Sequence, residues 1–258
     1  MPGFQRPGDT EIPLPRLRSI SQLWRLAAGL SALGVAAMAI DVPLANWARS
    51  ESSPRAFQKL CSLSEIFGHG VGVVTILLLV AVLDPRHRYA LPRIAAAALG
   101  SGLLANALKL LVARDRPYHF DFSGPSSETF LQWFPMLSNS SGEQSFPSSH
   151  VATAAGLAIV LARYYPRGRW LFPLFAALAG CQRVLEEAHF LSDVFWGATV
   201  GCIFAPLCVY GSRLSGAFDH LEERLVRFWG IKAGGHSLLR AETPAQPNVV
   251  STDASRAA

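Results

Sequence analysis

The sequence predicts an all-α fold, a polytopic membrane helical bundle with six transmembrane helices. Composition is the first reason, because 50% of the 258 residues are hydrophobic and 16% are charged, with a mean hydropathy of +0.27. A soluble domain has about a quarter of its residues charged. The second reason is a series of six apolar runs, and the third is the placement of basic residues in the short connectors between them.

The apolar runs differ in how their ends are built. They lie at residues 26–40, 66–83, 94–113, 148–162, 170–188 and 194–212. A helix needs roughly 20 residues to cross the hydrocarbon core. The third run reaches this length only with Lys109, the fourth needs the preceding FPSSH, and the fifth extends through Arg183. Charges at membrane depth are costly, so these polar ends indicate a functional site.

The order of the helices predicts where the polar ends meet. With six crossings, the end of the third helix, the start of the fourth, the end of the fifth and the start of the sixth face one side. Most of the 23 Lys and Arg residues lie in segments on the opposite side. The positive-inside rule then places both termini in the cytoplasm and the polar cluster on the extracytoplasmic face. For a bacterial source, the expected location is the inner (plasma) membrane.

Segments outside the bundle are expected to be peripheral. The predicted division is a polar cytoplasmic N-terminal segment (1–22), a six-helix membrane domain (23–213), an amphipathic surface helix (214–232) and a disordered tail (233–258). In the third of these, Phe218, Leu221, Leu225 and Phe228 recur at helical spacing between charges, which is typical of a helix on a membrane surface. A partner-binding helix is the alternative. The sequence predicts no oligomeric state.

Two classes of function are disfavoured by composition. The net charge of +5 comes from basic residues scattered among connectors, which indicates membrane topology and no nucleic-acid partner. The four cysteines lack paired spacing, and Cys61 falls in a connector, so neither a disulfide framework nor a CxxC metal site is predicted.

Three stretches combine charged, hydroxyl and imidazole side chains: KLLVARDRP (109–117), PSSH (147–150) and RVLEEAHFLSD (183–193). Each has an ordinary structural explanation, namely a pair of snorkelling cations, a serine-capped helix start and a polar loop between buried helices. Together, in this order and on one membrane face, they indicate a functional site.

The first two stretches and Arg183 contain side chains that are able to bind an anion. Lys109, Arg116 and Arg183 supply positive charges for the oxygens of a phosphoryl group, and the arginines can bind as planar forks. Ser148 and Ser149 stand at a helix start, where free N–H groups and the helix dipole favour negative charge.

Two histidines and an aspartate provide groups that react. His150 and His189 supply a nucleophile and an acid, and Asp193, one helical turn after His189, can hold the second ring nitrogen and fix the tautomer. No carboxylate cluster accompanies the histidines as a two-metal site requires, so neither a metal nor another cofactor is predicted.

The three stretches resemble the motifs of the superfamily of type 2 phosphatidic acid phosphatases and vanadium haloperoxidases, which read K-x6-RP, PSGH and SR-x5-H-x3-D. The resemblance covers roughly residues 66–212. Ser149 replaces the glycine of the second motif and Gln182 replaces the serine of the third. The resemblance implies that His189 is the nucleophile, forming a phosphohistidine, and that His150 protonates the leaving oxygen.

The resemblance implies an integral membrane phosphatase that hydrolyses a lipid phosphate or pyrophosphate at the extracytoplasmic face. Its expected partners are that lipid substrate and membrane lipids. Candidate substrates are phosphatidic acid, phosphatidylglycerol phosphate, undecaprenyl diphosphate and phosphorylated lipid A. The alternatives are a lipid phosphotransferase using the same site, a vanadate-dependent haloperoxidase, which six membrane segments disfavour, and a non-catalytic lipid carrier, which has little need of two histidines.

Other polar residues receive smaller roles. Arg114 is a candidate for an additional phosphate contact, whereas His69 and His119 are interpreted as local hydrogen-bonding groups. The aromatic connector 118–146 is expected to be a lid over a lipid headgroup or an anchor at the membrane surface.

Overall fold

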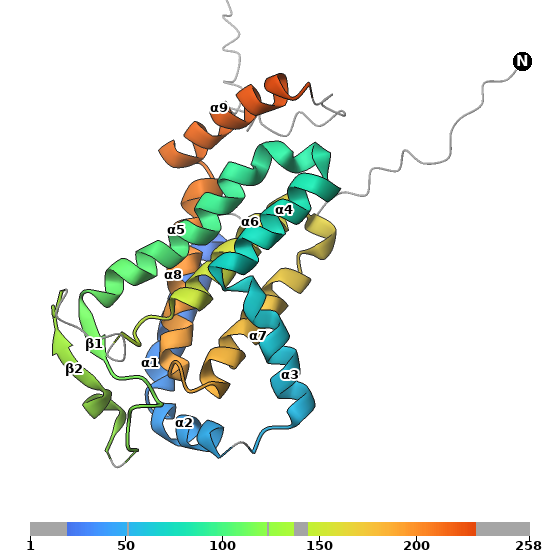
Figure 1. Ribbon diagram of the computed structural model, residues 1–258. Coiled ribbons are helices and arrows are strands. Elements are labelled where there is room, and N and C mark those ends of the chain that lie inside the picture. The colour runs from blue at the N-terminus through green and yellow to red at the C-terminus, as the bar shows by residue number, and fades with distance from the viewer. Residues whose placement is uncertain (1–19, 51, 123, 137–143, 231–258) are drawn as a thin grey trace, which may run out of the picture.

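The computed structural model describes residues 20–230 except 51, 123 and 137–143 (Figure 1). Predictions for residues 1–19 and for the tail 233–258 therefore lie outside the described residues. The helices are α1 (Ile20–Ala37), α2 (Asp41–Arg49), α3 (Arg55–Ser64), α4 (Gly70–Leu83), α5 (Leu91–Lys109), α6 (Ser149–Tyr164), α7 (Leu171–Leu185), α8 (Leu191–Val209) and α9 (Arg213–Phe228). Short 3₁₀ turns are η1 (Glu65–Phe67), η2 (Pro85–Ala90), η3 (Ser126–Thr129) and η5 (Pro166–Gly168).

The predominantly helical fold is confirmed, and each predicted apolar run overlaps one of α1, α4, α5, α6, α7 and α8. Within the described residues, three helices are long and apolar enough to cross a membrane: Ile20–Ala37, Pro85–Lys109 and Leu191–Val209. A fourth candidate is the pair Arg55–Phe67 and Gly70–Leu83, which is bent by 69°. The apolar helices support the membrane assignment, but α6 and α7 have only 16 and 15 residues. The six-crossing count therefore remains a prediction.

Small residues allow the central helices to approach closely. Helix α6 packs against α5, α7 and α8, and α1 packs along α8. A Cβ atom at Gly156 of α6 would lie 2.4 Å from the carbonyl oxygen of Ala97 in α5, and one at Gly201 of α8 would lie 2.7 Å from that of Ala152. Glycine at these two contacts lets the helix backbones touch, as is common between membrane helices.

The predicted helix of the run 94–113 ends early, at Lys109. Residues 110–113 do not continue the helix; instead β1 (Val112–Arg114) pairs antiparallel with β2 (Phe130–Trp133). The physical reason is a change in backbone partners, because the N–H groups of Phe134 and Met136 bond to the carbonyls of Leu111 and Leu110. Residues 130–136 thereby run back along residues 110–114.

Two helices occupy the connector between the first two apolar runs. Helices α2 and α3 were not predicted, and Cys61, which the sequence placed in a connector, is fully buried in α3. Helix α3 and its η1 turn bend sharply into α4 at Gly68 and His69.

Ion pairs hold α9 at one end of the bundle, opposite the end that carries α2, β1 and β2 (Figure 1). Arg93 of α5 is 1% exposed; its Nε lies 2.7 Å from Glu222 Oε1 and its Nη2 lies 2.5 Å from Asp219 Oδ1. Helix α9 is therefore docked through its acidic face. Its residues largely coincide with the segment 214–232, for which the sequence predicted a surface helix. Its position on a membrane surface remains a prediction.

Candidate active site

The structure brings the three motifs together at the end of the bundle where α5 finishes and α6 and α8 begin. Lys109, the last residue of α5, donates through Nζ to the carbonyl oxygens of Gln144 and Ser145. The Ser148 backbone N–H, just before α6, donates to the Asp193 carbonyl oxygen at 3.1 Å. These contacts join residues that are far apart in the sequence into one cluster.

Asp193 lies at the centre of this cluster with its carboxylate fully buried. The carboxylate accepts three hydrogen bonds: from Arg114 Nη1 at 2.5 Å, from Ser145 Oγ at 2.6 Å and from the Phe190 N–H at 2.9 Å. The last of these caps the first turn of α8. A buried carboxylate needs such partners, because an unpaired buried charge is strongly destabilising.

Ser145 connects Asp193 to His189. Asp193 Oδ2 lies 3.8 Å from His189 Nδ1, which is too long for the direct hydrogen bond expected from the sequence. The Ser145 hydroxyl lies between them, 3.5 Å from Nδ1. Because its single proton is donated to Asp193, Ser145 can only accept from His189. This arrangement places the proton of the neutral imidazole on Nδ1 and leaves the lone pair on Nε2.

The surroundings of His189 keep its ring neutral. Burial is the largest influence and lowers the pKa of His189, and the nearby charges of Lys109 and Arg116 act in the same direction, whereas Asp193 opposes them. The site therefore combines a neutral imidazole with fixed cations, and a neutral imidazole nitrogen with a free lone pair is able to act as a nucleophile.

Arg114 belongs to the support of the site. Its side chain is fully buried, with Nη2 2.7 Å from Asp41 Oδ2, Nη1 2.7 Å from Ser192 Oγ and Nε 2.9 Å from Thr129 Oγ1. With its contact to Asp193, this guanidinium is fully engaged by the protein. The possibility of a phosphate contact from Arg114 is therefore not supported by its position.

Sequence reasoning missed Ser145, Asp41 and Ser192. Asp41, the first residue of α2, accepts from the Ser192 N–H at 2.9 Å and from its hydroxyl at 2.5 Å, as well as from Arg114. Ser192 lies in the third stretch, but at a position that the motif leaves open, and no spacing marks Ser145 or Asp41. Only the acidic residue within an otherwise apolar stretch gave a signal.

Several buried donors at the site have no hydrogen-bond partner within the described part of the chain. They are Arg116 Nε, Arg183 Nε and Ser148 Oγ. Arg183 makes only long ion pairs, 3.4 Å from Nη1 to Glu65 Oε1 and 3.4 Å from Nη2 to Glu186 Oε2. Unpaired buried polar groups are rare in proteins and usually indicate a functional demand. These donors are suited to an anion.

The remaining site residues lie at the same end. Ser149 is the first residue of α6, and His150 follows it, half-buried, with its ring 5.6 Å from that of His69. Gln182 is 1% exposed, and neither of its side-chain polar atoms has a partner among the described residues. Nothing in the structure explains this glutamine at the position of the motif serine.

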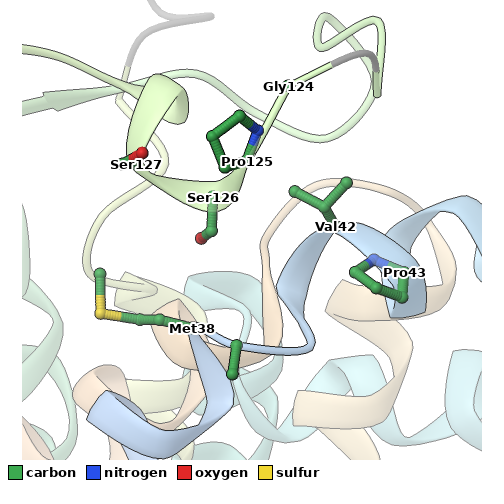
Figure 2. A pocket seen from close by; sticks show the side chains of 8 residues that line it. Met38, Val42, Pro43, Gly124, Pro125, Ser126 and Ser127 are labelled. Atoms are coloured by element: carbon green, nitrogen blue, oxygen red, sulfur yellow. The ribbon is translucent and has the colours of Figure 1, made fainter.

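A groove of about 590 Å³ lies between residues 38–43 and residues 124–127 (Figure 2). Met38, Ala39, Val42 and Pro43 line it on one side, and Gly124, Pro125, Ser126 and Ser127 face them. Ser126 Oγ lies 3.5 Å from Arg114 Nη2, so the groove borders the buried arginine that supports the site. No predicted site residue lines this groove, which therefore does not hold the reacting group.

Among the residues that the structure describes, no group of three or more His, Cys, Asp or Glu side chains is arranged to hold a metal ion. The side chains at this end that could bind a substrate anion carry cationic and hydroxyl groups.

Comparison with known proteins finds a family model that matches the part of the chain with the three motifs. Residues 90–216 match the family described as the PAP2 superfamily. A lipid A 1-phosphatase of Rhizobium johnstonii is 39% identical over 107 residues, covering 42% of this chain and 41% of the relative. A lipid A 1-phosphatase of Rhizobium etli is 38% identical over 107 residues, covering 42% and 44%. The chain thus spans less than half the length of these curated relatives.

One match is to a solved structure from Bacillus subtilis, described as the first transmembrane PAP2 type phosphatidylglycerolphosphate phosphatase. The match covers 81% of the present chain and 98% of the chain in the solved structure. The sequence identity is 17% and the TM-score is 0.46. The family match includes all three motifs, so the resemblance inferred from the sequence is confirmed. Helices α1 to α4, including Asp41, lie outside the matched region.

We expect Asp41→Asn to lower kcat for p-nitrophenyl phosphate by about 10²-fold with little change in KM, because small displacements of a reacting group cost this much. In this variant Arg114 loses the Asp41 carboxylate as a partner and no longer fixes Asp193 and Ser192. Asp219→Asn is the matched control, since it removes an arginine partner at the opposite end of the bundle. Full activity of a folded Asp41→Asn protein would show that Asp41 does not position the site.

Proposed function

We propose, from the match of residues 90–216 to the PAP2 superfamily, that the chain is a membrane phosphatase acting on a lipid phosphate or pyrophosphate. The observation that carries the proposal is a set of buried donors near a neutral His189. These donors, Arg116 Nε, Arg183 Nε and Ser148 Oγ, have no partner among the residues that the structure describes. Fixed cations around a nucleophile stabilise the charge of a transferring phosphoryl group without a metal.

In the first proposed step, His189 Nε2 attacks phosphorus while the bond from phosphorus to the leaving oxygen breaks. A phosphohistidine forms, and His150 donates a proton to the departing oxygen. Ser145 accepts from Nδ1–H and Asp193 stabilises the positive charge that develops on the ring. These roles follow the family resemblance, and the orientation of the imidazole supports the assignment of the nucleophile.

Lys109, Arg116 and Arg183 hold the three non-bridging phosphoryl oxygens in this proposal, with Ser148, Ser149 and the N–H groups at the start of α6 as further donors. In the second step, a water molecule attacks the phosphohistidine and gives its proton to His150. The bond between phosphorus and nitrogen breaks, phosphate leaves, and both histidines return to their starting states. No cofactor takes part.

We also propose six membrane crossings, with the site on the extracytoplasmic face of a bacterial inner membrane and both termini in the cytoplasm. Helices α6 and α7 would be about 24 and 22 Å long at 1.5 Å per residue. They fall short of a core of about 30 Å. A site at the ends of these helices would lie at headgroup depth, where a lipid phosphate is found.

The substrate we favour is a lipid A-like glycolipid with a phosphate on its sugar. This choice rests on the names of the two relatives, lipid A 1-phosphatase, each of which matches 107 residues of this chain. Phosphatidic acid, phosphatidylglycerol phosphate and undecaprenyl diphosphate are the comparison substrates for a direct assay of the purified protein.

Vanadate is expected to inhibit phosphate release, because its five-coordinate form resembles a phosphoryl group in transfer to His189. EDTA is expected to leave the activity unchanged, since cationic side chains do the work of a metal. The measurement is phosphate release with each compound at equal substrate concentration. Loss of activity with EDTA that a divalent metal restores would contradict this account.

The two histidines are expected to respond differently to the leaving group. Loss of the acid in His150→Ala should slow the hydrolysis of a lipid alkyl phosphate by about 10²–10⁴-fold. The effect on p-nitrophenyl phosphate should be much smaller, because its leaving group needs little protonation. His189→Ala should abolish both activities. The ratio of the two rates in each variant checks the assignment, and equal losses in His150→Ala would refute the acid role.

Sidedness is testable with single cysteines placed at exposed positions at opposite ends of the bundle. We expect a membrane-impermeant thiol reagent to label Ser127→Cys in intact spheroplasts but not Arg167→Cys. Exposed Cys181 is replaced by alanine in this background, and the other three cysteines are buried. The reverse labelling pattern would place the site in the cytoplasm.

A further inference from the structure

The break between α3 and α4 lies directly over the proposed acid. A Cβ atom at Gly68 would be 2.6 Å from the carbonyl oxygen of His150, so the backbone of the break touches the start of α6. The η1 turn before it contacts both α6 and α7. The break therefore brings residues 65–69 to the side of the site where His150 and Arg183 lie, although none of the three motifs includes them.

Glu65 reaches the site through Arg183. Its Oε1 atom lies 3.4 Å from Arg183 Nη1, and its side chain is 38% exposed. A long, solvent-accessible ion pair of this kind is weak. A phosphoryl group with two negative charges would compete well for Arg183. The Glu65 carboxylate would then be a free hydrogen-bond acceptor beside the bound phosphate.

His69 presents a donor at the same rim. Its Nδ1 accepts a hydrogen bond from the Val71 N–H at 3.2 Å, so the proton of the neutral ring is on Nε2. The side chain is exposed, and its ring centre is 5.6 Å from that of His150. If His150 protonates the leaving oxygen, the group attached to that oxygen must pass close to His69.

We infer that Glu65 and His69 form a subsite for the leaving group and that they select one rich in hydroxyl groups, such as a sugar. His69 Nε2–H donates to an oxygen of this group, and the Glu65 carboxylate accepts from one of its hydroxyls. Diacylglycerol, released from phosphatidic acid, has no hydroxyl beyond the one that carried the phosphate. It therefore offers no donor to Glu65. This inference rests on the proposed function, because it uses the position of the departing oxygen.

The test compares two lipids in the same detergent micelles, a diacylated glucosamine 1-phosphate and dioleoyl phosphatidic acid. The variants are Glu65→Ala and His69→Ala. Ser62→Ala is the control, because Ser62 is exposed on α3 and its hydroxyl donates to the Gln58 carbonyl of the same helix. The readout is the ratio of kcat/KM for the two lipids. Loss of Glu65 also frees Arg183, but that change affects both substrates and cancels in the ratio.

The wild-type protein is expected to prefer the glycolipid. Each variant should lose about tenfold in kcat/KM on the glycolipid, the effect of one hydrogen bond at the strong end of the usual range, and less than about twofold on phosphatidic acid. The control should keep the wild-type ratio. Equal losses on both lipids, or a wild-type preference for phosphatidic acid, would overturn the subsite.

The failure of this inference is distinguishable from failure of the proposed function. If His189→Ala is inactive but the Glu65 and His69 variants keep the wild-type ratio, the subsite alone is wrong. If His189→Ala still releases phosphate from both lipids, His189 is not the nucleophile, and the leaving group does not lie at His69.

Discussion

The buried contact between Arg114 and Asp193 is the interaction on which the arrangement of the site depends. Both side chains are fully buried, and the guanidinium also holds Asp41. Removing charges from water is costly, and a buried ion pair of this kind is often no more stabilising than apolar side chains of the same size. Its value here is geometric. It fixes the carboxylate that orients Ser145, and Ser145 in turn sets the tautomer of His189.

The helical bundle makes this geometry possible by bringing helix ends together. Glycines at the contacts of α6 with α5 and α8 let the backbones touch, so Lys109, Ser148 and Asp193 meet at one end. The opposite end has its own buried arginine, Arg93, which holds α9 through two carboxylates. The two arginines differ in what they serve, because only the network of Arg114 leads to an imidazole.

The helical fold and the motif residues of the site were predictable from the sequence. The supporting residues and the departures from the helical pattern were not, and the reasons are physical. The motif residues are recognisable since charged groups are rare in apolar runs and their spacing is fixed by the chemistry. Ser145 and Asp41 have no such spacing; a short polar side chain in a connector or at a helix start has many ordinary explanations. Hydropathy also gave no sign that α3 and α4 form a bent pair or that β1 replaces the end of a helix, because both depend on contacts with distant segments.

The most direct test of the account is to trap the reaction intermediate. A lipid substrate labelled in its phosphate is mixed with the protein, quenched within one turnover under alkaline denaturing conditions that preserve phosphohistidine, and the labelled peptide is identified by mass spectrometry. The account predicts a phosphoryl group on His189, absent in His189→Ala and accumulating more slowly in Asp41→Asn. A phosphoryl group on His150, or rapid phosphate release with no labelled protein at any time, would contradict it.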